Sequence, residues 1–64
     1  MKVEIQKHPK TGVNEAFIEG LLVGVFEQMT PSSDVYSFMS KCSHEKLSGD
    51  HYIAIGQALN ELNN

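Results

Sequence analysis

The residues that could do chemistry are densest in the stretch CSHEKLSGDH, residues 42–51. Three side chains in this stretch are of the types that bind zinc: Cys42, His44 and His51. A fourth ligand could come from Asp50 or Glu45 in the same stretch, or from His8. The spacing argues against a metal centre, because zinc ligands within a pair usually lie about two to four residues apart. Here one residue separates Cys42 from His44 and six separate His44 from His51. We expect no metal and no cofactor, with Cys42 in the core as a buried free thiol.

The same residue types could also form a cysteine nucleophile with a histidine base. That chemistry needs an orienting third group and an oxyanion site within a cleft. A chain of 64 residues has little room to wall such a cleft. A phosphate-binding loop is not indicated either, because neither EGLLVG nor LSGD is followed by the lysine and hydroxyl that such a loop needs. We therefore expect that the protein is not an enzyme.

The N-terminal segment offers a different chemistry, contact with nucleic acid. Lys2, Lys7 and Lys10 place three of the five lysines within the first ten residues. A strand followed by two helices is the element order of ribbon-helix-helix repressors, and the chain resembles that family in this order alone. The resemblance implies a dimeric DNA-binding regulator in which Lys2, Gln6 and Lys7 contact the nucleic acid. Glu4 departs from this scheme because it would repel phosphate, and the HPKTG spacer and a third helix are additional to that fold.

Composition makes nucleic acid the alternative rather than the expected partner. The net charge is −3 and the chain has no arginine, whereas nucleic-acid binders usually carry a basic surface. The length predicts a single small domain over residues 1–64. One cysteine excludes an internal disulfide framework and fits a reducing compartment. The longest uncharged run near the glycines, GLLVGVF, is far shorter than a membrane span, so we expect a cytoplasmic protein without membrane contact.

The elements that would position these residues begin with a strand. Residues 2–6 alternate between apolar and polar side chains, which is typical of a half-buried strand. Pro9 and Gly12 then predict a turn over residues 8–12. Residues 13–18 allow three interpretations: a helix capped by Asn14, a strand that returns antiparallel to residues 2–6, or a short strand before a helix from about Glu19. We favour the helix.

In that helix, the apolar residues form one broad stripe: Phe17, Leu21, Leu22, Val25, Phe26 and Met29. Ala16, Gly20 and Gly24 would lie one above another, because residues four apart are neighbours on a helix. Small residues allow close approach of another backbone. We expect this glycine face to pack against another helix of the chain, and the alternatives are a self-dimer or a groove for a partner.

Two more helices are expected. Thr30 and Pro31 predict a start, and a helix from about Pro31 to residue 43 or 46 is predicted by apolar residues spaced three, one and three apart: Val35, Phe38, Met39 and Cys42. Gly49 would end it as a left-handed cap, and Ser48 or Asp50 would cap the next helix. That third helix would place on one face Tyr52, Ile55, Gly56, Leu59 and Leu62.

The sequence thus predicts a mainly α (α+β) domain with a short N-terminal strand or hairpin followed by two to three helices. A homodimer could complete the strand. The predicted function is that of a small, non-catalytic regulator, an adaptor or inhibitor that binds another protein, as is typical of small bacterial or phage accessory proteins. The candidate interface residues are Ala16, Gly20, Gly24, Tyr36, Phe38 and Tyr52, because small residues allow close approach and aromatic residues are frequent binding anchors.

Overall fold

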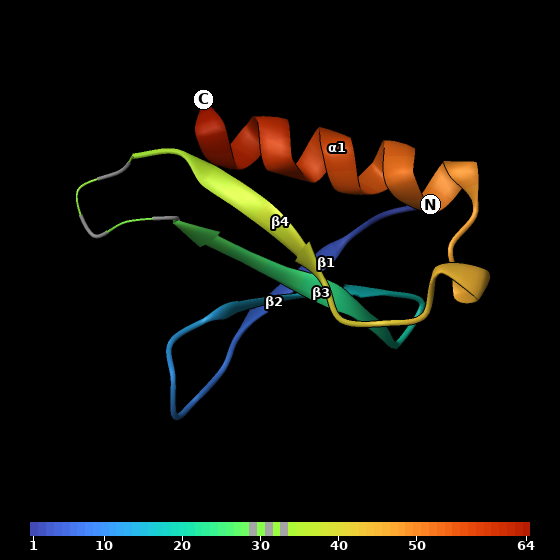
Figure 1. Cartoon of the computed structure of the whole chain (residues 1–64), viewed down its shortest axis with the longest axis horizontal. Helices are drawn as coiled ribbons and strands as arrows, with labels where there is room; N and C mark the ends of the chain where they lie inside the picture. The colour runs from blue at the N-terminus through green and yellow to red at the C-terminus, as the bar shows by residue number, and fades with distance from the viewer. Residues whose placement is uncertain (29, 31, 33) are drawn as a thin grey trace.

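The computed structural model describes residues 1–28, 30, 32 and 34–64, and its centre is a four-stranded antiparallel sheet (Figure 1). The strands lie in the sheet in chain order: β1 (Glu4–Lys7), β2 (Asn14–Ile18), β3 (Leu21–Gln28) and β4 (Tyr36–Ser40). A short 3-10 helix, η1 (His44–Lys46), then leads to the helix α1 (Gly49–Asn63). The predicted mainly α fold with two to three helices is therefore wrong, since most of the regular structure up to residue 40 is strand.

The first hairpin joins β1 to β2. His8 N–H donates to the Val13 carbonyl at 2.8 Å, and Gly12 N–H donates to the His8 carbonyl at 2.9 Å. Gly12 has a φ of 75°, which glycine adopts at little cost. The turn predicted over residues 8–12 is confirmed. Residues 14–18 form the antiparallel strand that we held as an alternative, so the favoured helix is wrong and β1 finds its partner strand within the chain.

The second hairpin joins β2 to β3 where the middle of the long helix was expected. Glu19 and Gly20 form its turn, with φ of 51° and 84°. Positive φ at both central residues is the signature of the tight turn that matches the twist of paired strands. The flanking residues are rich in β-branched and aromatic side chains, which suit strands. The stacked face of Ala16, Gly20 and Gly24 therefore does not form, because Gly20 lies in a turn between two strands.

A β-bulge in β3 decides which side chains share a face of the sheet. Ala16 is opposite Gly24 and Phe17 is opposite Leu22, so Val23 is an extra residue in β3. The side chains of Ala16, Ile18 and Val23 are all buried. We call the face that carries them the inner face, and the opposite one the outer face.

The helix α1 covers the inner face and lies alongside β4 (Figure 1). The core combines residues of the sheet with two from the helix: Ala16, Ile18, Val23 and Phe26 with Ala54 and Ile55. The ring of Phe38 in β4 packs beside that of Phe26: the ring centroids are 5.5 Å apart and the ring planes are tilted by 56°. Burial of such apolar surface is the main term that stabilises a fold, and here it requires α1 to stay on the sheet.

The third predicted helix is confirmed as α1. Ser48 is its N-cap, one of the two caps predicted. Ile55 is buried, and Leu59 and Leu62 pack against the core, but Tyr52 is 48% exposed and turns away from it. Gly49 begins this helix and does not end an earlier one.

The second predicted helix, from Pro31 to residue 43 or 46, is replaced by β4 and η1. Its 3-1-3 spacing of apolar residues arises because both faces of β4 carry apolar side chains, with Phe38 on the inner face and Met39 on the outer. Met29 and Pro31, which the sequence predicts to lie in helices, are outside the described residues.

Candidate functional site

The outer face of the sheet is the surface on which we build the candidate site. Side chains alternate along a strand, and directly opposed residues of neighbouring strands share a face. From the register, the outer-face residues are Glu4, Gln6, Glu15, Phe17, Leu22, Val25, Glu27, Ser37 and Met39. The described part of α1 packs against the inner-face residues of the core, so the outer face lacks the cover that the helix gives the core.

Four apolar side chains form a cluster on this face, which we call the outer cluster. Phe17 is paired with Leu22, and Val25 is paired with Met39. Met39 is 44% exposed, and Phe17 and Leu22 are half-buried. Val25 is only 6% exposed, since it lies between Glu15 and Met39 in the register. The outer cluster is thus a contiguous apolar surface on the sheet, of the kind that marks contact sites when it is not covered.

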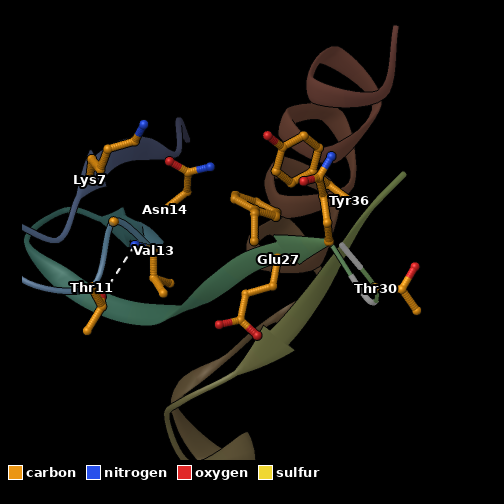
Figure 2. A pocket seen from close by; sticks show the side chains of 10 residues that line it. Lys7, Thr11, Val13, Asn14, Glu27, Thr30 and Tyr36 are labelled. Carbon is orange, nitrogen blue, oxygen red and sulfur yellow. Dashed lines mark hydrogen bonds between the residues drawn. The ribbon is translucent and has the colours of Figure 1, made fainter. Parts of the chain in front are cut away.

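A hollow of about 460 Å³ lies at the end of the sheet where β1 ends and β2 begins (Figure 2). Lys7, Asn14 and Tyr36 point to one side in this view, and Glu27 points to the other. Val13 N–H donates to Thr11 Oγ1 at 3.3 Å, the dashed line in Figure 2. The hollow is wide open and polar, so it can offer hydrogen bonds, but the described residues that line it include no thiol or imidazole with which to build a nucleophile and its base.

His8, His51 and Cys42 each have structural partners. His8 Nδ1 accepts the N–H groups of Lys10 and Thr11, at 3.1 and 3.3 Å, and so holds the first turn. His51 Nδ1 accepts the N–H of Ser48 at 3.0 Å at the start of α1. Cys42 is half-buried and packs against the core.

Within the described residues, no three His, Cys, Asp or Glu side chains come close enough to hold a metal. The side chain of His44, one of the proposed ligands, lies outside what the structure describes. The remaining acidic candidates, Glu45 and Asp50, lie in η1 and in the first turn of α1.

The predicted interface residues are distributed over several environments. Ala16 has no accessible surface, and Gly20 forms the β2–β3 turn. Gly24 lies beneath the Phe38 ring: a Cβ there would meet the Met39 carbonyl and come within 2.6 Å of Phe38 Cε1. The glycine does permit a close approach, but between two strands of one sheet.

The aromatic members of that set lie on the inner face and on the helix. Tyr36 and Phe38 are half-buried in β4, and Tyr52 is on the exposed side of α1. Whether any of them contacts a partner stays a prediction. The outer cluster was missed because it exists only once residues 14–28 are paired as strands. The Glu19–Gly20 step between two apolar runs was the local signal for that pairing.

The three residues assigned to nucleic acid do not form one ribbon surface. Gln6 is on the outer face and Lys7 lines the hollow, since neighbouring residues of a strand point to opposite faces. Lys2 lines a different hollow, whose wall also includes Ala58 and Glu61 of α1. The strand-helix-helix order on which the resemblance to ribbon-helix-helix repressors rested is absent from the described chain.

The fold and the site together define a small α+β protein, a β-meander with a C-terminal helix on one face and an apolar cluster on the other. Comparisons with protein-family models, with curated proteins and with solved structures found no match. None of the helices in the described residues is long and apolar enough to cross a membrane.

Proposed function

We propose that this protein is a small, non-catalytic regulator that binds another protein with the outer face of its sheet. It would act in the cytoplasm as an adaptor or inhibitor of a larger protein. The observation that supports the proposal best is the outer cluster, whose four apolar side chains lie opposite the face that α1 covers.

The rigidity of the scaffold supports the same proposal. The outer cluster is built on three neighbouring strands, and its members are held by the sheet register rather than by a loop. Behind Val25, the inner face is filled by Ala16 and Phe26, which are 0% and 1% exposed. A partner that buries the cluster therefore meets a preformed surface, and little conformational entropy is lost on binding.

The test is site-specific photo-crosslinking in the cells that make the protein. A photo-reactive phenylalanine analogue replaces Met39 in one version and Tyr52 in a second. Both side chains are exposed to a similar extent, 44% and 48%, but they lie on the sheet and on the helix respectively. We expect the Met39 version to give one dominant crosslinked protein that the Tyr52 version does not give.

Purified partner then provides the quantitative measurement. Met39→Lys should abolish binding, because it places a charge in the centre of a desolvated contact. Tyr52→Lys is the matched control and should bind as the unmodified chain does. The proposal is wrong if the partner is captured through Tyr52 instead, or if Met39→Lys binds with unchanged affinity.

The homodimer stays a prediction, and the edge of the sheet at β1 supports one way in which it could form. β1 is an edge strand whose four residues are all exposed, and an edge strand offers unpaired backbone groups to a second strand. Pairing of β1 with its copy would extend the sheet and leave the outer cluster free. Mass measurement in solution across a dilution series distinguishes this dimer from a monomer.

A further inference from the structure

The outer face carries charge of one sign next to its apolar cluster. Glu4 is opposite Phe17, which lies two residues after Glu15 on β2. On the other side of β2, Glu15 is opposite Val25, and Glu27 lies two residues after Val25 on β3. These three glutamates are therefore diagonal neighbours on successive strands, about 7–8 Å apart between strands. Together they form a line of carboxylates across the sheet, which we call the acidic diagonal.

The acidic diagonal borders the outer cluster on its β1 side. Glu4 is adjacent to Phe17, and Glu15 is adjacent to Val25. The three carboxylates form no ion pair with any other described residue. On the side of the sheet away from β1, Lys41 follows β4, and its N–H donates to the Val23 carbonyl. The diagonal thus keeps its negative charge for whatever covers the cluster.

This arrangement selects among the possible occupants of the outer face. A second copy packed face to face would bring a second acidic diagonal against the first, in a chain of net charge −3. Nucleic acid and anionic lipid headgroups carry the same sign of charge and are repelled. A cationic protein surface is attracted, and its apolar residues can cover the outer cluster.

We infer that the partner presents apolar side chains flanked on one side by lysine or arginine, and that the acidic diagonal orients it on the sheet. This inference rests on the proposed function, because it describes the partner of the same surface. It adds a chemical class for that partner and a direction: the cationic border of the partner lies over β1 and β2, and its apolar part lies over β3 and β4.

Two synthetic amphipathic helices serve as probes, one made only of leucine and lysine and one in which each lysine is replaced by glutamate. Each is titrated into isotopically labelled protein, and backbone amide resonances are followed by NMR. We expect the leucine–lysine peptide to shift the resonances of Glu15, Val25 and Met39, with an affinity that falls as salt is added. The leucine–glutamate peptide should leave them unchanged.

Charge reversal identifies the groups responsible. The double variant Glu15→Lys/Glu27→Lys should weaken binding of the leucine–lysine peptide by about tenfold, a loss of the size that two exposed charge pairs supply. Glu45→Lys/Glu61→Lys makes the same change in net charge at exposed positions of η1 and α1 and should leave the affinity within about twofold. The spectrum of each unbound variant shows whether it is folded.

The outcomes separate the inference from the proposed function. If both peptides shift the outer-face resonances equally, or if the control double variant weakens binding as much as the test variant, the acidic diagonal does not select the partner, although the face still binds. If neither peptide shifts these resonances, or if the shifts lie around Tyr52 and Ile53 of α1, the outer face is not the docking surface and both ideas are overturned.

Discussion

The side-chain amide of Asn63, near the end of α1, is joined by two hydrogen bonds to the backbone of Tyr36, the first residue of β4. Tyr36 N–H donates to Asn63 Oδ1 at 2.7 Å, and Asn63 Nδ2 donates to the Tyr36 carbonyl at 3.1 Å. The amide thus takes the place of a neighbouring strand at this point on the edge of β4. It also fixes the C-terminal end of the helix to the sheet, across 27 residues of sequence.

Replacing Asn63 should loosen this end of the helix. Asn63→Ala removes both hydrogen bonds and should lower the free energy of unfolding by about 1–2 kcal/mol, whereas Asn63→Asp keeps an acceptor for Tyr36 N–H and should lose less. Urea denaturation measures the change. Asn60→Ala, at an exposed position of the same helix, is the control and should not destabilise the protein. Equal stability of the Asn63→Ala variant and the unmodified chain would contradict the role of this contact.

Substitution by alanine should have opposite effects on stability at Gly24 and at Gly56. Gly24→Ala puts a methyl group against the Met39 carbonyl and the Phe38 ring. Since the backbone cannot move without breaking the sheet, we expect a loss of about 2–3 kcal/mol in the free energy of unfolding. Gly56→Ala meets no atom within 4 Å and should stabilise the helix by about 0.5–1 kcal/mol. Thermal unfolding of the two variants side by side tests both signs at once.

The start of α1 depends on His51. Its Nδ1 accepts the Ser48 N–H at 3.0 Å and lies 2.8 Å from Ser48 Oγ. His51 is the third residue after the N-cap, a position that glutamate or glutamine usually occupies in a capping box. His51→Ala should therefore destabilise the protein by about 0.5–1 kcal/mol, and His51→Glu should restore the loss. Circular dichroism during denaturant titration gives both values. Failure of glutamate to restore stability would show that the imidazole acts by packing and not by capping.

Met39 should matter for binding and not for folding. Met39→Lys changes a side chain that is 44% exposed, so we expect its free energy of unfolding to stay within about 0.5 kcal/mol of the unmodified chain. Its affinity for the captured partner should nevertheless be lost. Parallel denaturation and binding measurements on one preparation separate the two effects. A large loss of stability would instead make Met39 part of the core.

The N-terminal strand, the turn over residues 8–12 and the third helix could be predicted from the sequence, because each has a local signal. Val3 and Ile5 alternate with polar residues, and Ser48 is a good N-cap. The middle strands could not be predicted by the same reasoning. The bulge at Val23 breaks the period of two, and the resulting order of apolar residues in β3 imitates a helical stripe.

The outer cluster could not be predicted, because its residues come together only through the pairing of the strands. Phe17 and Met39 are far apart in sequence, and only the pairing of β2 with β3 and of β3 with β4 brings them into one cluster. The interpretation of residues 14–29 as a helix instead assigned Gly20 and Gly24 to an interface. In the structure, Gly20 adopts the positive φ of a turn, and Gly24 leaves room for the ring of Phe38. Propensity could not decide between these readings, because contacts between strands determine the outcome.

The strand order β1-β2-β3-β4 also has a consequence for how the chain acquires its structure. Each strand pairs with the one made just before it, so loop closures are short and we expect the sheet to form rapidly. All four strands are complete by residue 40, before any residue of α1 has been synthesised. A chain whose sheet has formed before α1 packs on it exposes Phe26 and Ile18, and in this interval it should depend most on chaperones.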